Sequence, residues 1–195
     1  MHKGRLEAFS DGVIAIIITI MVLELRPPEG HEWASLEALG PVFLSYTLSF
    51  VFLGIYWNNH HHLFQASKRV NGRVLWANLH LLFWLSITPF ATAWMGESHF
   101  AATPVAAYGA VLMLSGIAYY ILARSLVSLH GRDSALATAL GQDLKGKISV
   151  VVYAVGIALA RVSPVTSCIL YVLVAAMWLV PDPRVERALA AAKPD

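Results

Sequence analysis

The chain is poor in charge and has almost no cysteine. Only 13% of its 195 residues are Asp, Glu, Lys or Arg, whereas soluble domains carry about 25%. The single cysteine, Cys168, excludes a disulfide within the chain, so the fold cannot depend on one. The formal net charge is only +2, which gives no basis for expecting a nucleic-acid partner.

Hydrophobic residues are correspondingly abundant. They make up 57% of the chain, and the mean hydropathy is +0.62, as is typical of integral membrane proteins. A helix needs about 20 mostly apolar residues to cross the hydrocarbon core, because its backbone groups must be satisfied within the segment. The sequence therefore predicts an all-α membrane protein in which residues 1–195 form one transmembrane domain with roughly six crossings.

Six apolar segments can be delimited, and breaks separate several of them. Pro27-Pro28 follows the first segment, and Ser163-Pro164 marks a tight turn between the last two. The third segment contains Pro89, which a membrane helix tolerates as a kink. The predicted helices cover residues 5–25, 40–62, 74–94, 103–127, 147–161 and 164–180.

Basic residues are divided unequally between the two sides that six crossings create. Lys and Arg near span ends collect on the cytoplasmic side of membranes. One side would carry only Arg26 and Arg161, so both termini are expected in the cytoplasm of a multi-pass protein of the cell membrane. We expect the first segment to be retained and not cleaved as a signal peptide, because Asp11 interrupts its apolar run. The other side would carry twelve: Lys3, Arg5, Lys68, Arg69, Arg73, Arg124, Arg132, Lys145, Lys147, Arg184, Arg187 and Lys193.

Carboxylates stand at both ends of the first predicted helix. Between Asp11 and Glu24 the only polar side chain is that of Thr19, and the apolar zone is about 18 Å long at 1.5 Å per residue. Residues three and four apart share a helix face, so one stripe contains Ile16, Thr19, Ile20 and Leu23. Such a stripe is typical of an ordinary packing seam between helices. In a symmetric assembly, however, the carboxylates at its two ends would form acidic rings that concentrate cations.

Titratable groups follow at the end of the second predicted helix. Three consecutive histidines, His60 to His62, point about 100° apart on a helix, so they cannot converge on one metal ion, and we expect no metal site. One or two of them can face inward and hydrogen-bond to the first helix. Asn78 and His80 of the third predicted helix add polar candidates at the same depth.

Two motifs carry a family resemblance. The first reads Arg5-x-x-x-Phe9-Ser10-Asp11 and continues as Gly12-Val13-x-Ala15-Ile16-x-x-Thr19 at the start of the first predicted helix. The second, Trp57-x-x-His60, lies at the end of the second predicted helix. Together they resemble the signatures of the transmembrane protein 175 family, potassium-permeable channels of endosomes and lysosomes with prokaryotic homologues.

The resemblance implies an architecture and a function. Members have six helices per repeat, and their first helices line the pore in place of a carbonyl-lined selectivity filter. Since eukaryotic members dimerise with two repeats each, a single-repeat chain implies a homotetramer. By motif, Ile16 matches the family's constriction, Thr19 its selectivity-related threonine and Leu23 a further narrowing. The expected function is a potassium-permeable cation channel, not an enzyme, with no cofactor; its expected partners are copies of itself, the lipid bilayer and monovalent cations.

The motif residues Arg5, Phe9, Ser10 and Asp11 would then hold the pore helix in place. Arg5 and Asp11 are six residues apart, about 240° around a helix, so they cannot pair with each other. We hypothesise that Asp11 accepts hydrogen bonds from His60 or His61, with Trp57 as a further donor.

Two other functions fit parts of the sequence. In a proton-coupled membrane transporter, Asp11 and the histidines would form a relay, but the carboxylates lie near span ends and transporter sites lie near the midplane. A haem protein or membrane enzyme would need histidines on facing helices, which His60 or His61 with His80 offers. No nucleophile and base constellation accompanies them.

Overall fold

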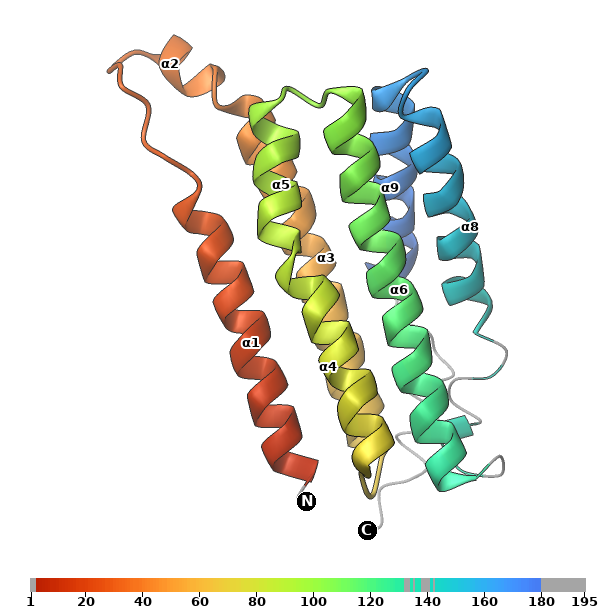
Figure 1. The fold of residues 1–195 in the computed structure, drawn as a ribbon. Coiled ribbons are helices and arrows are strands. Elements are labelled where there is room, and N and C mark those ends of the chain that lie inside the picture. Colours follow the sequence, from red (N-terminus) through yellow and green to blue (C-terminus); the bar gives the residue numbers. More distant parts are fainter. Residues whose placement is uncertain (1–2, 132–133, 135, 138–140, 142, 180–195) are drawn as a thin grey trace.

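The computed structural model describes residues 3–131, 134, 136–137, 141 and 143–179, and its regular elements there are all helices. Element labels are those of Figure 1. The helices are α1 (Lys3–Leu23), α2 (Trp33–Glu37), α3 (Gly40–Gln65), α4 (Gly72–Ser86), α5 (Thr88–Glu97), α6 (Ala102–His130), α8 (Leu144–Leu159) and α9 (Pro164–Leu179).

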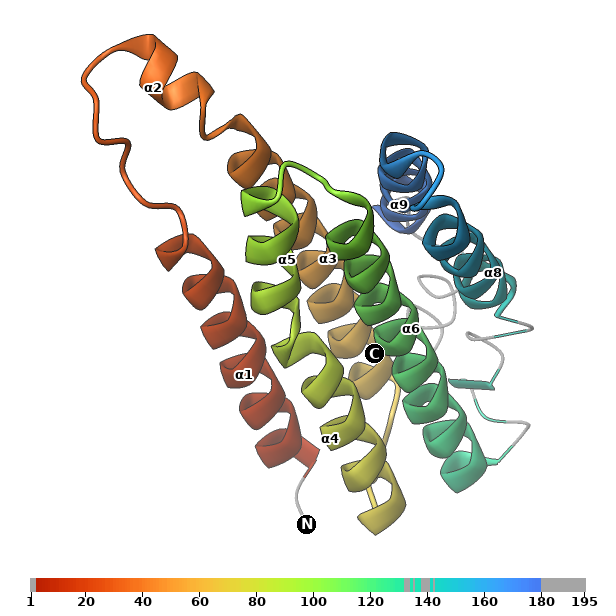
Figure 2. The same cartoon turned by 45° about the horizontal axis from the view of Figure 1, so that its top comes forward.

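The long helices run side by side in an up-and-down bundle (Figure 1). α1 lies at one edge and contacts α3, α4 and α5. α6 packs on α4 and α5 on one side and on α8 on the other, and α9 follows beside α8. Figure 2 shows α1 and the α8–α9 pair at opposite edges, with the short α2 projecting beyond the bundle. One edge of the molecule is therefore formed by α1 alone.

Within the described part of the chain, four helical stretches are long and apolar enough to cross a membrane. They are Lys3–Leu23, Gly40–Gln65, Gly72–Glu97, which joins α4 and α5, and Ala102–His130. α8 and α9 have 16 residues each, short of the roughly 20 that a perpendicular crossing needs. The all-α membrane class is confirmed, and the predicted count of six crossings stays a prediction.

The third predicted helix is divided in two. The sequence predicted one helix over residues 74–94 with a kink at Pro89, whereas α4 ends at Ser86 and α5 begins at Thr88. Pro89 sits in the first turn of α5, where its missing N–H needs no partner. Two residues before Pro89, the Ile87 N–H donates to the Trp84 carbonyl oxygen at 3.3 Å and closes α4. The break therefore comes just before the proline.

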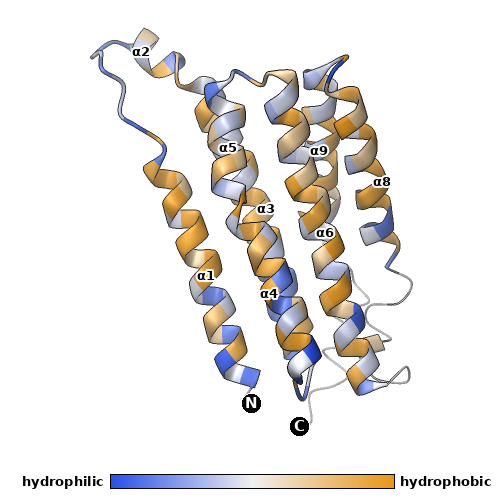
Figure 3. Cartoon of the chain, viewed as in Figure 1, coloured by the Kyte–Doolittle hydropathy of each residue, from blue (hydrophilic) through white to orange (hydrophobic). Residues whose placement is uncertain are grey.

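The basic residues are segregated along the bundle. Eight of the twelve in the larger predicted set are described, and they belong to the start of α1, the α3–α4 connection, the start of α4, the last turns of α6 and the start of α8, which share one end of the bundle. Figure 3 shows polar colour at this end of α1, α4 and α8 and apolar colour toward the middle. Arg26 and Arg161 belong to the other end. The remaining four, Arg132, Arg184, Arg187 and Lys193, lie outside the described residues.

Candidate functional site

α1 has two faces of opposite environment. Its buried side chains recur every three or four positions, from Leu6 and Ser10 to Ile17 and Met21, and they pack on α3, α4 and α5. The predicted pore residues lie on the opposite face: Ile16 is 59% exposed, Leu23 is 76% exposed, and Thr19 is exposed between them. The chain thus leaves one largely apolar face of α1 uncovered by its own helices.

Thr19 is oriented by its own helix. Its Oγ1 donates a hydrogen bond to the Ile16 carbonyl oxygen at 2.9 Å. A threonine hydroxyl has one hydrogen and two acceptor lone pairs. Because the hydrogen is used within α1, the hydroxyl presents oxygen lone pairs to whatever approaches the exposed face, which is the arrangement a cation requires.

A chain of hydrogen bonds through Ser10, called the Ser10 chain below, holds the buried face of α1. Ser10 Oγ donates to the Leu6 carbonyl oxygen at 2.8 Å and accepts a hydrogen bond from Asn78 Nδ2 of α4 at 2.9 Å. Asn78 Oδ1 lies 2.8 Å from His60 Nε2 of α3. Since the amide nitrogen of Asn78 already donates to Ser10, its oxygen is the acceptor and His60 carries its hydrogen on Nε2. All three polar side chains are buried, and together they tie α1 to α3 and α4.

Asp11 is bound separately from this chain. Trp57 Nε1 of α3 donates to Asp11 Oδ1 at 3.1 Å, as predicted. The hypothesis was wrong for His60, which bonds to Asn78 instead. His61 is exposed and stacks on the Trp57 ring with centroids 6.2 Å apart. Ser10 and Asp11 therefore face different partners, because adjacent helix residues point about 100° apart.

Lys3 is an anchor that the sequence reasoning missed. Its Nζ donates to the carbonyl oxygens of Phe64 at 2.8 Å and Ser67 at 3.1 Å, where α3 ends. A cation there satisfies free helix carbonyls and complements the negative end of the helix dipole. Lys3 and Phe64 are 61 positions apart in the chain, so the sequence gives no local signal for this contact. The motif residues Arg5 and Phe9 are exposed on α1.

A second buried chain of hydroxyls crosses the other half of the bundle. Thr92 Oγ1 donates to the Thr88 carbonyl oxygen at 2.7 Å, so it accepts from Ser49 Oγ, 2.7 Å away. Ser49 in turn accepts from the Tyr108 hydroxyl at 2.9 Å. The chain runs from α6 through α3 to α5, and Thr92 also lies 3.9 Å from Met21 Sδ of α1. Sequence reasoning did not identify it.

A groove of about 710 Å³ opens beside α1. Most of its wall is apolar, with the carboxylates of Glu24 and Glu97 as its charged groups among the described residues. It exposes the flank of α1 that carries Ile16. The lining comprises Val13, Ile16, Ile17, Ile20 and Glu24 from α1 and its end, and Ser86, Pro89, Phe90, Ala93, Trp94 and Glu97 from α4 and α5.

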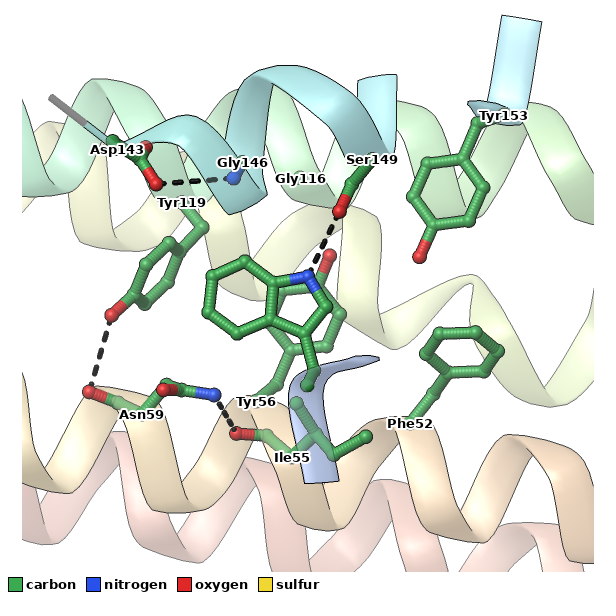
Figure 4. Close-up of a pocket in the computed structure, with 11 residues that line it drawn as sticks. Phe52, Ile55, Tyr56, Asn59, Gly116, Tyr119, Asp143, Gly146, Ser149 and Tyr153 are labelled. Carbon is green, nitrogen blue, oxygen red and sulfur yellow. Dashed lines mark hydrogen bonds between the residues drawn. The ribbon is translucent and has the colours of Figure 1, made fainter. Parts of the chain in front are cut away.

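A smaller cavity of about 40 Å³ lies between α3, α6, α8 and α9 (Figure 4). At about 10–15 Å³ of such volume per molecule, it has room for roughly three or four waters. Trp178 Nε1 of α9 donates to Ser149 Oγ of α8 at 2.9 Å beside it, and the Tyr119 hydroxyl donates to the Asn59 carbonyl oxygen at 3.2 Å. No described residue of α1 lines it, so it is separate from the candidate pore face.

His60 and His80, the pair that a haem protein or membrane enzyme would use, lie in different environments. His60 is buried and His80 is exposed, where it accepts a hydrogen bond from Trp84 Nε1 at 3.0 Å. Among the described residues, no group of three His, Cys, Asp or Glu side chains is placed to hold a metal ion.

Apolar helices of membrane-spanning length, tied together by buried polar chains, define an all-α integral membrane protein. Residues 5–89 match the sequence profile of the family described as endosomal/lysosomal potassium channel TMEM175. A potassium channel of Chryseobacterium sp. (strain P1-3) is 57% identical over 189 residues, which cover 97% of this chain and 98% of that protein. The chain belongs to the TMEM175 family, and the resemblance read from the motifs is confirmed.

Two further comparisons agree with this assignment. The crystal structure of a lysosomal potassium-selective channel TMEM175 homolog from Chamaesiphon minutus superimposes with a TM-score of 0.77 at 28% identity, covering 91% of this chain and 96% of that one. The mouse endosomal/lysosomal proton channel TMEM175 is 34% identical over 116 residues, 53% of this chain and 23% of the mouse protein. The profile match begins at Arg5 and spans α1, α3 and α4, the helices that share the Ser10 chain.

Proposed function

We propose that four copies of this chain form a potassium-permeable cation channel whose pore is lined by α1. One observation carries the proposal: α1 is anchored on one face by Ser10 and leaves Ile16, Thr19 and Leu23 uncovered on the other. Around a common axis, four such helices line a central passage with this face. In a lone chain, the same face only contacts lipid. The potassium channels among the relatives support the same reading.

Each uncovered residue has a physical role in this pore. A ring of Ile16 side chains forms a narrow apolar neck, which gates by losing its water. Thr19, about one turn away, presents hydroxyl oxygens because its hydrogen is bound to the Ile16 carbonyl. Leu23 forms a second apolar narrowing. Conduction then needs no carbonyl-lined filter, and selectivity for potassium over sodium is modest because few oxygens replace the hydration shell.

The carboxylates act differently at the two ends. Asp11 is engaged by the Trp57 indole, so its role is to fix α1 against α3. Glu24 is exposed just beyond the end of α1, and four copies form an acidic ring that raises the local cation concentration. With six crossings both termini lie on the same side of the cell membrane, and the basic residues at that end assign it to the cytoplasm, so Glu24 lies on the outer side.

The described contacts do not favour a proton-coupled transporter. The buried chain from His60 ends at the Leu6 carbonyl within α1 and does not reach the uncovered face. The donor to Asp11 is an indole N–H, which does not exchange protons with a carboxylate during transport. A passive channel is therefore the better account of this site.

Reconstitution into planar lipid bilayers tests the proposal. Under opposed potassium and sodium gradients, the native chain is expected to conduct passively, with a reversal potential that follows potassium and ignores an imposed pH gradient. Ile16→Ala widens the neck and should raise conductance severalfold, while Thr19→Val removes the hydroxyls and should abolish the preference for potassium.

The matched control is Val165→Ala on α9, which truncates an exposed apolar side chain at the opposite edge of the bundle. It should leave conductance and reversal potential unchanged. Equal behaviour of the Ile16, Thr19 and Val165 variants would show that α1 does not line the pore, and a reversal potential set by the pH gradient would favour the transporter.

A further inference from the structure

A polar groove lies where α6 ends and α8 begins, away from the candidate pore. Its volume is about 680 Å³. α6 contributes Tyr120, Arg124 and Ser128, and α8 contributes Lys147. No described residue of α1 lines it. It lies at the end of the bundle that carries most of the basic residues, the level at which lipid headgroups meet a membrane protein.

The two cations of the groove are available to a ligand. Arg124 and Lys147 are exposed, and the ion pair found among the described residues joins Lys3 to Glu7 at the far edge of the bundle. The described carboxylate in the lining, Asp143, accepts the Gly146 N–H at 3.1 Å and caps the start of α8. Among the described residues of the lining, two cations without an ion-pair partner stand against one engaged carboxylate, and this balance favours an anion.

An apolar stripe leads away from the groove along α8. Lys147 stands at the base of side chains that recur every three or four positions and therefore share a face. On α6, Ile121 is exposed next to Tyr120. A soluble anion uses only the charged groove, whereas an amphiphile uses the groove and the stripe together. The stripe contains Leu144, Ile148, Val151 and Val155, all exposed.

We propose that this groove binds the phosphate group of an anionic membrane lipid. Arg124 and Lys147 contact the phosphate, the hydroxyls of Tyr120 and Ser128 donate to headgroup oxygens, and an acyl chain lies along the α8 stripe. Basic pockets between membrane helices have the chemistry for such headgroups. The bound lipid bridges α6 and α8 and stabilises their junction, and the proposal does not depend on the identity of the pore.

The test measures lipid binding to the purified full chain in neutral detergent. Phosphatidylglycerol is titrated while bound lipid is counted by native mass spectrometry and the midpoint of thermal unfolding is followed. Phosphatidylcholine and inorganic phosphate are titrated in parallel. Arg124→Gln and Lys147→Gln are compared with Arg73→Gln, which removes an exposed cation at the same end of the bundle but outside the groove.

Phosphatidylglycerol is expected to bind and raise the midpoint, and each groove variant should weaken its apparent affinity by about fivefold. Arg73→Gln should leave the affinity unchanged. An equal loss for Arg73→Gln would mean diffuse surface charge, and equal protection by inorganic phosphate would mean a free-anion site; either result overturns the proposal, as does unchanged binding in both groove variants. If Arg124→Gln does not fold, Lys147→Gln decides alone, because Lys147 is exposed and its removal leaves the packing intact.

Discussion

At the scale of single residues, Asn78 has a structural role greater than its size suggests. Its amide donates to Ser10 and its carbonyl accepts from His60, so one side chain satisfies two buried polar groups on two other helices. Removing it leaves the Nε2 hydrogen of His60 without a partner, and it takes one accepted hydrogen bond from Ser10, which keeps its bond to the Leu6 carbonyl oxygen.

Asn78→Ala is expected to destabilise the protein by on the order of 2–4 kcal/mol, because each orphaned buried group costs about 1–3 kcal/mol. The midpoint of thermal unfolding in detergent measures the change. Asn58→Ala is the matched control, since Asn58 is exposed on α3, and it should shift the midpoint little. Similar midpoints for the two variants would show that the Ser10 chain contributes nothing to stability.

The bond between Trp57 and Asp11 is expected to contribute less, although one partner is charged. Trp57 is exposed and Asp11 is half-exposed, so solvent competes for both groups. A double-mutant cycle of Asp11→Ala and Trp57→Phe should give a coupling energy of about 0.5–1 kcal/mol in thermal unfolding. Strict additivity of the two substitutions would mean that the 3.1 Å contact has no energetic role.

At the scale of helices, the direction of a hydrogen-bond chain determines which member matters most. Tyr108 donates to Ser49, which donates to Thr92, which donates to the Thr88 carbonyl oxygen. Ser49 is the middle member and joins α6 to α5 through α3.

Ser49→Ala should therefore cost more stability than Tyr108→Phe. The first substitution leaves the Tyr108 hydrogen and a Thr92 lone pair unpaired, whereas the second leaves only a Ser49 lone pair, at about 1 kcal/mol. Thermal unfolding of both variants, with Thr47→Val on the exposed face of α3 as the control, gives the order. A larger loss for Tyr108→Phe would reverse the assigned direction.

The helices also show how much of the fold can be predicted from the sequence. Apolar run length and proline position are local signals, and they placed helices 5–25 and 40–62 close to α1 and α3. They did not reveal that the chain closes α4 before Pro89, because a kinked and a divided helix share the same sequence pattern. The family motif includes Ser10, but the partner of Ser10, Asn78, is 68 positions away. Only tertiary packing determines that Asn78 is the partner. The pore roles of Ile16, Thr19 and Leu23 stay predictions.

At the scale of the whole molecule, the segregation of basic residues predicts which segments reach the outside of the cell. In a Cys168→Ser background, Arg26→Cys and Arg161→Cys should react in intact cells with a thiol reagent that cannot cross membranes. Arg69→Cys, in the α3–α4 connection at the opposite end, should react only after lysis. Because Arg161 lies between α8 and α9, its protection in intact cells would mean that those 16-residue helices do not cross the membrane.

Assembly is the property on which the proposed pore depends most. If four α1 helices surround one axis, Leu23 side chains from different chains come within reach of each other, whereas Val151 at the far edge of each bundle stays apart. In the Cys168→Ser background, oxidation of Leu23→Cys should give covalent dimers within a particle of four chains of 21.3 kDa, and Val151→Cys should remain monomeric on denaturing gels. Cross-linking of the Val151 variant in place of the Leu23 variant would put α8 at the interface and turn α1 toward lipid.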